Sequence, residues 1–225
     1  MNFFFVNAVV ARSVISTDGL IPQQKSDVCE STLLAQAAAD KKHTSMSEEE
    51  VVAWYDTYIN TMSALGWTLQ QRDPFTEVPV HEAQRAVHNV ALTSLAKDEV
   101  NKSTFASIQS GLAAFLDTFE DSTAEQVMNG ASIAPPTFAH FQLASATYDI
   151  DVVLTLWAFC YSSDQEIKSA LRHPCQGATV SMKKSKIVMA LNSDVYSQVR
   201  SAVHEKLSNA GVLNQLVPLC KYSFL

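Results

Sequence analysis

The chain has 225 residues, of which 47% are hydrophobic, and this is enough to bury a core without disulfide support. It carries 23 Asp/Glu against 16 Lys/Arg, a net charge of −7 and a sequence pI near 5.3, which excludes sequence-nonspecific nucleic-acid binding by the chain as a whole. The four cysteines lie far apart without a CxxC pair, which excludes the spacing of a zinc site and of a disulfide-dense secreted scaffold. We therefore expect no nucleic-acid partner, no metal and no cofactor, with a cytoplasmic location by default and secretion as the alternative.

The charge and the hydrophobic pattern both change near Pro135–Pro136. Residues 1–130 contain 17 Asp/Glu and 8 Lys/Arg, a net −9, whereas residues 131–225 contain 6 and 8, a net +2, and the two values add to −7. Apolar residues recur at helical spacing before the proline pair and alternate at strand spacing after it. The contrast predicts two kinds of surface with different partners.

The N-terminal half reads as a short strand followed by helices. Residues 2–11 predict a strand, with a targeting segment as the alternative, because the apolar run is far shorter than the ~20 residues of a membrane span. A helix is expected from Ser26 or Asp27 to about Ala39. A capping box at Ser47 to Glu50 opens a second helix that Gly66 ends. Further predicted elements are a polar connection over 68–80, helices over 81–97 and 105–119, and a short helix opened by a capping box at 122–125 and closed at Gly130.

The C-terminal half reads as strands closed by a helix. A hairpin is predicted from strands over 138–148 and 151–161, and the second strand carries apolar side chains on both faces. A strand covered on both faces requires helices on one side and further structure on the other. After a short helix opened by a capping box at 163–166, a third strand is expected over 178–191. Asn192 or Ser193 then caps a final helix that Gly211 ends, and the apolar tail 212–225 is expected to dock on the fold.

These elements predict an α+β protein in which an N-terminal helical layer packs on a small antiparallel sheet, closed by a C-terminal helix. The helical layer takes residues 1–130, and the sheet with its C-terminal helix takes 136–225. Because the second strand needs a cover on both faces, one core is expected to span the proline pair, so that 1–225 forms a single domain.

The sequence contains none of the short signatures of the P-loop, GxSxG, HExxH, GxGxxG or EF-hand proteins. The sharpest candidate for catalysis is His173-Pro174-Cys175, where the imidazole could activate the thiol as a nucleophile. No oxyanion-hole motif accompanies this pair, and the alternatives are an inert loop and a reactive or lipid-modified cysteine. His81 and His88 lie roughly 10 Å apart along one helix, too far to share a metal ion.

Lys183, Lys184 and Lys186 form the one dense basic cluster of the sequence, on or beside the third strand. Near an anionic membrane each lysine contributes about 1 kcal/mol, so the cluster is a candidate membrane- or anion-binding site. The alternative is a solvated strand edge, where lysines prevent unwanted pairing with other strands.

A helical layer beside long strand hairpins resembles the compact cytolytic toxins that insert into membranes. The sequence lacks a catalytic signature, has a basic cluster beside long apolar strands and begins with an apolar segment. Together with the resemblance, these features predict a non-enzymatic, toxin- or virulence-factor-like protein that acts at a membrane surface or by self-assembly into a homo-oligomer. One alternative is a small thiol-dependent enzyme that uses Cys175 with His173. Another is an inhibitor or immunity protein that binds a basic protein partner through its acidic helical face.

Overall fold

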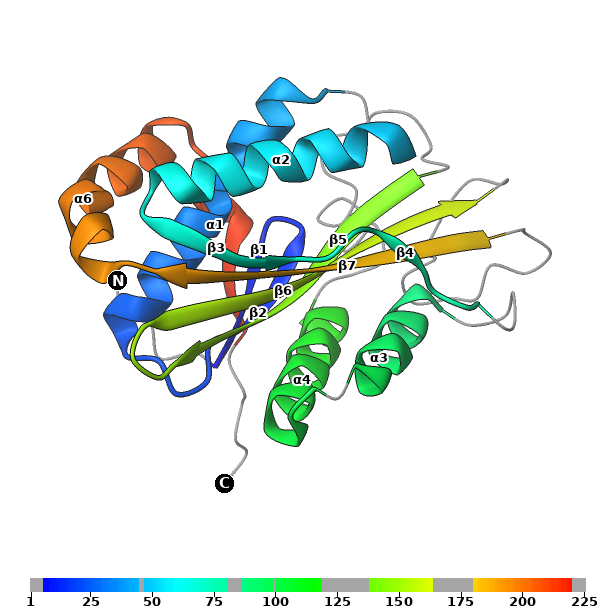
Figure 1. Cartoon of the computed structure of the whole chain (residues 1–225). Coiled ribbons are helices and arrows are strands. Elements are labelled where there is room, and N and C mark those ends of the chain that lie inside the picture. The colour runs from blue at the N-terminus through cyan, green and yellow to red at the C-terminus, as the bar shows by residue number, and fades with distance from the viewer. Residues whose placement is uncertain are drawn as a thin grey trace.

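The computed structural model describes residues 6–44, 47–80, 86–98, 100–118, 138–163 and 180–219. In this part of the chain a mixed sheet of eight strands lies between two layers of helices (Figure 1). The strands are β1 (Asn7–Val10), β2 (Ser13–Ser16), β3 (Trp67–Arg72), β4 (Thr76–Glu77), β5 (Phe138–Tyr148), β6 (Val152–Ser163), β7 (Val180–Leu191) and β8 (Leu216–Leu219). The helices are α1 (Pro22–Lys42), α2 (Glu48–Ala64), α3 (Val87–Lys97), α4 (Lys102–Thr118) and α6 (Ser193–Asn209), with a 3-10 turn at Leu213–Gln215.

The centre of the sheet is the antiparallel set β5, β6 and β7, and the strand order is β3-β7-β6-β5-β2-β1-β8. β2 runs parallel to β5 with Ser16 opposite Ser145, and β1 and β8 extend the sheet from β2 in antiparallel pairs. At the other edge, β3 and β4 both pair with β7. One sheet therefore takes strands from both halves of the chain.

The two faces of the sheet are covered by different helices. α1, α2 and α6 cover one face, and α3 and α4 cover the other (Figure 1). Both faces need a cover because β6 carries apolar side chains on each of them. Leu154 and Leu156 pack in the core with α1, α2 and α6, while Trp157 and Phe159 pack in the core with α3 and α4. The prediction that this strand is apolar and covered on both faces is confirmed.

The α+β class is confirmed, but the expected small antiparallel sheet is wrong. The sheet is large and mixed because four-residue strands from the N-terminal segment and from the tail add to β5, one of them in parallel. The expected single helical layer is also wrong, since α1 and α2 lie on one face and α3 and α4 on the other. The acidic N-terminal helices are thus divided between two faces.

Several predicted boundaries agree with the structure. Ser47 caps α2 by accepting a hydrogen bond from the backbone N–H of Glu50 at 3.3 Å, and Asn192 caps α6 in the same way through Val195 at 3.1 Å. β5 has its predicted bounds, and residues 216–219 of the tail dock as a strand. The N-terminal strand is confirmed over Asn7–Val10.

Other boundaries were wrong. α1 begins at Pro22 rather than at 26 or 27, because proline suits the first helical position and the Gln24 side chain accepts from the Ile21 N–H at 3.1 Å. The expected polar connection over 68–80 contains β3 and β4, whose exposed side chains hide their strand character. The proline pair at 135–136 and the predicted helices opening at 122 and 163 fall largely or wholly outside the described residues.

Candidate functional site

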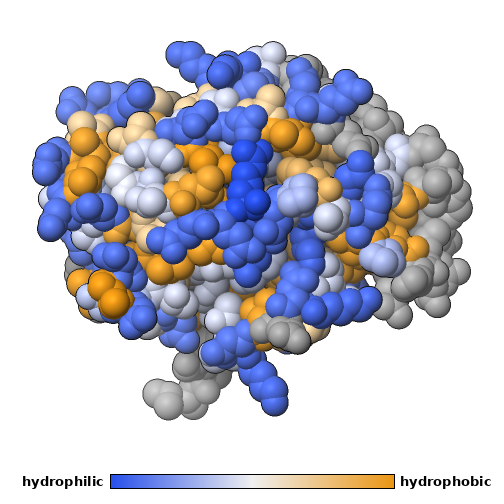
Figure 2. Space-filling model, viewed as in Figure 1, coloured by the Kyte–Doolittle hydropathy of each residue, from blue (hydrophilic) through white to orange (hydrophobic). Residues whose placement is uncertain are grey.

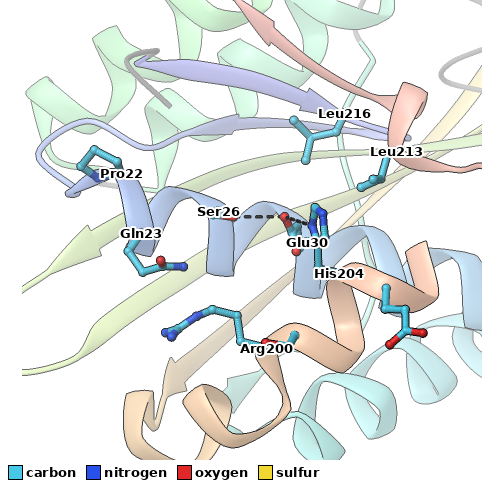
Figure 3. Close-up of a pocket in the computed structure, with 10 residues that line it drawn as sticks. Pro22, Gln23, Ser26, Glu30, Arg200, His204, Leu213 and Leu216 are labelled. Atoms are coloured by element: carbon cyan, nitrogen blue, oxygen red, sulfur yellow. Dashed lines mark hydrogen bonds and ion pairs between the residues drawn. The ribbon is translucent and has the colours of Figure 1, made fainter. Parts of the chain in front are cut away.

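A groove of about 800 Å³ lies between α1, α6 and the segment that enters β8. Pro22 and Gln23 line it at the start of α1, while Leu213 and Leu216 line its apolar side (Figure 3). Figure 3 shows that Glu30, farther along α1, and His204 of α6 point toward each other. The groove therefore combines an apolar wall with charged side chains from two helices.

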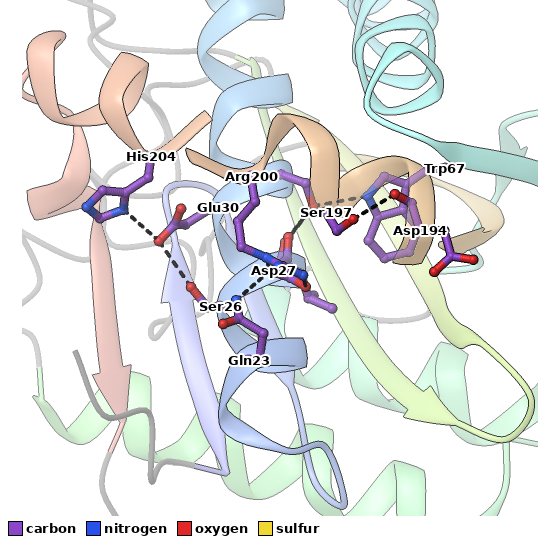
Figure 4. A network of polar contacts seen from close by, with 11 residues as sticks. Gln23, Ser26, Asp27, Glu30, Trp67, Asp194, Ser197, Arg200 and His204 are labelled. Atoms are coloured by element: carbon purple, nitrogen blue, oxygen red, sulfur yellow. Dashed lines mark hydrogen bonds and ion pairs between the residues drawn. The ribbon is translucent and has the colours of Figure 1, made fainter. Parts of the chain in front are cut away.

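The charged side chains of the groove form a network that joins α6 to α1 (Figure 4). The Arg200 guanidinium donates two hydrogen bonds of 2.8 Å to the two carboxylate oxygens of Asp27, which is only 4% exposed. Gln23 donates a further bond of 2.9 Å to Asp27, and the Arg200 guanidinium lies 5.9 Å from the centre of the Tyr196 ring. The hydrogen bond to Asp27 raises the pKa of Arg200, so this network fixes α6 on α1 through a paired buried carboxylate.

Glu30 is a buried carboxylate that lines the groove, and it binds His204. Nδ1 of His204 lies 3.0 Å from Oε1 of Glu30, an arrangement that orients the imidazole, and the His204 side chain is 59% exposed. The Ser26 hydroxyl donates to the same Oε1 at 3.1 Å. Because this hydroxyl is bonded to Glu30, it is not aligned to pass its proton to His204 as a nucleophile would. The contacts of Ser26, Glu30 and His204 therefore hold α1 and α6 together beside the groove and do not form a nucleophile–base pair.

A second polar cluster lies between the sheet and the α1–α2 layer. The Arg12 guanidinium contacts Nε2 of His140 and bonds Asp40 at 3.0 Å, and Trp54 donates its indole N–H to the same Asp40 oxygen at 2.8 Å. Burial, and after it the Arg12 charge, lower the pKa of His140 well below its usual range. The imidazole is therefore neutral and links β5 to the turn between β1 and β2.

The structure describes two of the four cysteines, Cys29 and Cys160. Cys29 and Cys160 are buried and are not joined in a disulfide bond, and burial raises the pKa of Cys29 to about 12, so this thiol stays protonated and unreactive. The predicted nucleophile Cys175 and its partner His173 lie outside the described residues. Within the described ranges no group of three or more His, Cys, Asp or Glu side chains could hold a metal ion.

The three lysines of the predicted anion site do not form one patch. Since side chains alternate along β7, Lys183 lies on one face of the sheet and Lys184 and Lys186 on the other. Lys183 pairs with Glu77 at 3.6 Å, and Nζ of Lys184 lies 2.6 Å from both carboxylate oxygens of Asp98. Lys186 lines a separate small pocket between the sheet and α4.

The sequence reasoning missed an exposed apolar end of the sheet. Ile150, in the turn between β5 and β6, is 85% exposed, and Tyr148 before it is 57% exposed. Ile21 follows β2, which runs parallel to β5, and Val195 follows β7, whose last residue pairs with the first residue of β6. These four residues therefore lie at one end of the sheet, at the left of Figure 1. We call this surface the apolar sheet end; its signal in the sequence was an isoleucine in a tight turn.

Most of the face shown in Figure 2 is hydrophilic, and its apolar residues form small separate groups. Among the described helices, none is long and apolar enough to cross a membrane.

No protein-family model and no curated protein matches this sequence. Several solved structures are similar in part, including the following three. A structure described as a delta-endotoxin has 12% identity over 83% of this chain and 86% of its own, with a TM-score of 0.47. The activated Cyt2Ba monomer from Bacillus thuringiensis subsp. israelensis has 11% identity over 82% of this chain and 100% of its own, with a TM-score of 0.45. The Evf virulence factor has 14% identity over 92% of this chain and 81% of its own, with a TM-score of 0.33.

By their descriptions, these similar structures include a delta-endotoxin and a virulence factor. TM-scores below 0.5 at 11–14% identity assign the chain to no family and carry no inference about its activity. The function is therefore argued below from the chain's own residues.

Proposed function

We propose that the protein is a non-enzymatic binding protein that attaches to a membrane surface through the apolar sheet end. The observation that carries this proposal is Ile150, which is 85% exposed at the tip of the β5–β6 hairpin beside the 57% exposed Tyr148. Transfer of an apolar side chain from water into the interface of a bilayer is favourable, and tyrosine is enriched at that depth.

The geometry of the turn supports insertion of Ile150. The backbone N–H of Asp149 donates to the carbonyl of Asp151 at 3.2 Å, so the turn is closed by its own hydrogen bond. The long antiparallel strands β5 and β6 hold this turn from behind. Because the turn is already ordered, little conformational entropy is lost on contact with the bilayer.

The charges at this end indicate which lipids are preferred. Asp149 and Asp151 flank Ile150, and Asp194 lies in the first turn of α6 at the same end. These carboxylates are repelled by anionic headgroups, an effect that salt screens. We therefore expect stronger binding to neutral phosphatidylcholine vesicles than to vesicles rich in phosphatidylserine, with the difference shrinking at high salt.

The test is co-sedimentation of the full chain with phosphatidylcholine vesicles. Burying an isoleucine side chain is worth about 1.5–3 kcal/mol, so Ile150→Asn is expected to weaken binding about 10- to 100-fold. Val52→Asn is the matched control, because Val52 is 44% exposed on α2 and makes no part of the apolar sheet end. We expect this control to bind like the unchanged protein.

Three results would overturn the proposal. The first is that the unchanged protein stays in the supernatant at every lipid concentration. The second is that Ile150→Asn and Val52→Asn lose the same amount of vesicle binding. The third comes from light scattering without lipid: the average mass of the unchanged protein rises with protein concentration, and the mass of Ile150→Asn is lower. That result would assign the apolar sheet end to a contact between copies of the chain.

A further inference from the structure

A pocket of about 260 Å³ lies on the face of the sheet that α3 and α4 cover, near the first residues of α4. Three adjacent strands contribute to its floor. Ser145 of β5 pairs with Thr155 of β6, and Trp157 of β6 pairs with Lys186 of β7. Neighbouring strands are about 4.8 Å apart, so these side chains lie within reach of one small ligand.

Lys186 is the uncompensated cation of this pocket. Within the described part of the chain its ammonium group forms no ion pair and no side-chain hydrogen bond. Asp98 also lines the pocket, but both of its carboxylate oxygens lie 2.6 Å from Nζ of Lys184, so its charge is balanced. The described charged side chains of the pocket and its Lys184 neighbour therefore sum to one positive charge.

The polar groups around Lys186 are hydrogen-bond donors without partners. The side-chain hydroxyls of Ser145, Thr155 and Thr104 form no hydrogen bond within the described ranges. Trp157 is 3% exposed, and its indole N–H is buried without an acceptor. A buried donor without an acceptor is unfavourable, and a ligand oxygen beside it would supply the missing hydrogen bond after a small shift of the neighbouring side chains.

The start of α4 adds partial positive charge to that of Lys186. Asn101 caps the helix by accepting from the N–H and the hydroxyl of Ser103, both at 2.9 Å, and Thr104 lies in the first turn. The N-terminal end of a 17-residue helix carries partial positive charge toward the pocket lining. The residues that carry these donors thus line one pocket from β5, β6, β7 and α4.

We infer that this pocket binds a phosphate-type oxyanion. Such an anion carries at least one negative charge, which balances the charge of Lys186. Its tetrahedrally arranged oxygens can accept hydrogen bonds from the hydroxyls, the ammonium group and the indole N–H on different sides. A free phosphate and the phosphodiester of a lipid headgroup share this chemistry. The inference rests on the pocket alone and does not depend on membrane binding by the apolar sheet end.

The test uses the indole N–H signals of the full chain in a ¹H–¹⁵N NMR titration with sodium phosphate, against sodium chloride of equal ionic strength. Trp157 reports on the pocket, while Trp54 and Trp67 already donate to Asp40 and to Ser31 at 2.8 and 3.1 Å and serve as internal controls. We expect a saturable shift of the Trp157 signal with phosphate, and none of the Trp54 or Trp67 signals.

Lys186→Met and Lys183→Met form a matched pair, since both remove one charge from β7 but only Lys186 faces the pocket. Loss of a hydrogen bond to a charged group lowers affinity about tenfold or more, so Lys186→Met is expected to raise the phosphate Kd by at least that factor, and Lys183→Met to leave it unchanged. Thr155→Val, which keeps the side-chain shape, is expected to weaken binding and provides a second variant if Lys186→Met does not fold.

Glycerophosphocholine in a parallel titration separates the two sources. Tighter binding of this diester supports the inference with a lipid headgroup as ligand, and tighter binding of inorganic phosphate supports it with a free ion or monoester. A Trp157 signal that does not move with either compound would overturn the inference. An equal loss of affinity in Lys183→Met and Lys186→Met would do so as well, because it would reduce binding to general charge attraction.

Discussion

Acid should destabilise this fold through one buried imidazole. His140 is 1% exposed, the Arg12 guanidinium lies against its Nε2, and its ring packs edge-on against Trp54 with 4.8 Å between the ring centres. Burial first, and the Arg12 charge second, lower the pKa of His140 well below the usual 6.5. The native protein therefore does not take up this proton at a pH where the unfolded chain does.

The sign and the size of the effect follow from that difference. Above about pH 6.5 the imidazole is neutral in both states and contributes nothing to the pH dependence. Below it the unfolded state binds a proton that the folded state refuses, so the free energy of unfolding falls by about 1.4 kcal/mol per pH unit until the folded pKa is reached. From pH 7 to pH 5 this amounts to about 1.9 kcal/mol, or about 4–8 °C in Tm for a chain of this length.

The assay is urea unfolding of the unchanged protein and of His140→Gln between pH 5 and 8. Glutamine keeps an acceptor for Arg12 but does not titrate, and Arg12, Asp40 and the other ionisable groups are present in both proteins. We expect the free energies of unfolding of the two proteins to change in parallel above pH 7. On going to pH 5, the stability advantage of the unchanged protein over His140→Gln should fall by about 1.9 kcal/mol. Curves that stay parallel down to pH 5 would refute a neutral, buried His140.

Two further substitutions test the packing around α6. Gly66 has φ +95°, and an added Cβ would lie 2.9 Å from Cγ1 of Val195, so Gly66→Ala should cost about 2–4 kcal/mol of unfolding free energy. Gly19→Ala, at φ +80° in open space, should cost only about 1–2 kcal/mol, and equal losses in thermal unfolding would contradict the steric part. Arg200→Met leaves the buried Asp27 without its two charged hydrogen bonds and should cost about 1–3 kcal/mol at pH 7 by urea unfolding; unchanged stability would contradict the proposed link between α1 and α6.

Local signals predicted the elements that have strong local patterns. The long alternating run of β5 and the side-chain caps at Ser47 and Asn192 are short-range features, and the structure confirms them. β6 shows the limit of this reasoning, since its two apolar faces predicted a cover on both sides but not which helices supply it. A stripe of apolar residues predicts which face of a helix is buried, but it does not predict which element packs against that face.

Elements and sites that depend on distant pairing could not be predicted. β2 has four residues, and its parallel pairing with β5 joins positions 13–16 to 142–145, for which no turn signal exists. β3 exposes most of its side chains at the sheet edge and reads as a loop. Glu30 and His204 meet across 174 positions. The split of the lysines could have been predicted, because neighbours on a strand face opposite sides.

The central claim is that the apolar sheet end touches the membrane, and hydrogen–deuterium exchange with and without phosphatidylcholine vesicles tests it most directly. We predict that vesicles slow exchange in the turn around Ile150 and leave exchange around Val52 on α2 unchanged. A protein that co-sediments with the vesicles but exchanges equally fast at Ile150 with and without them would contradict the claim.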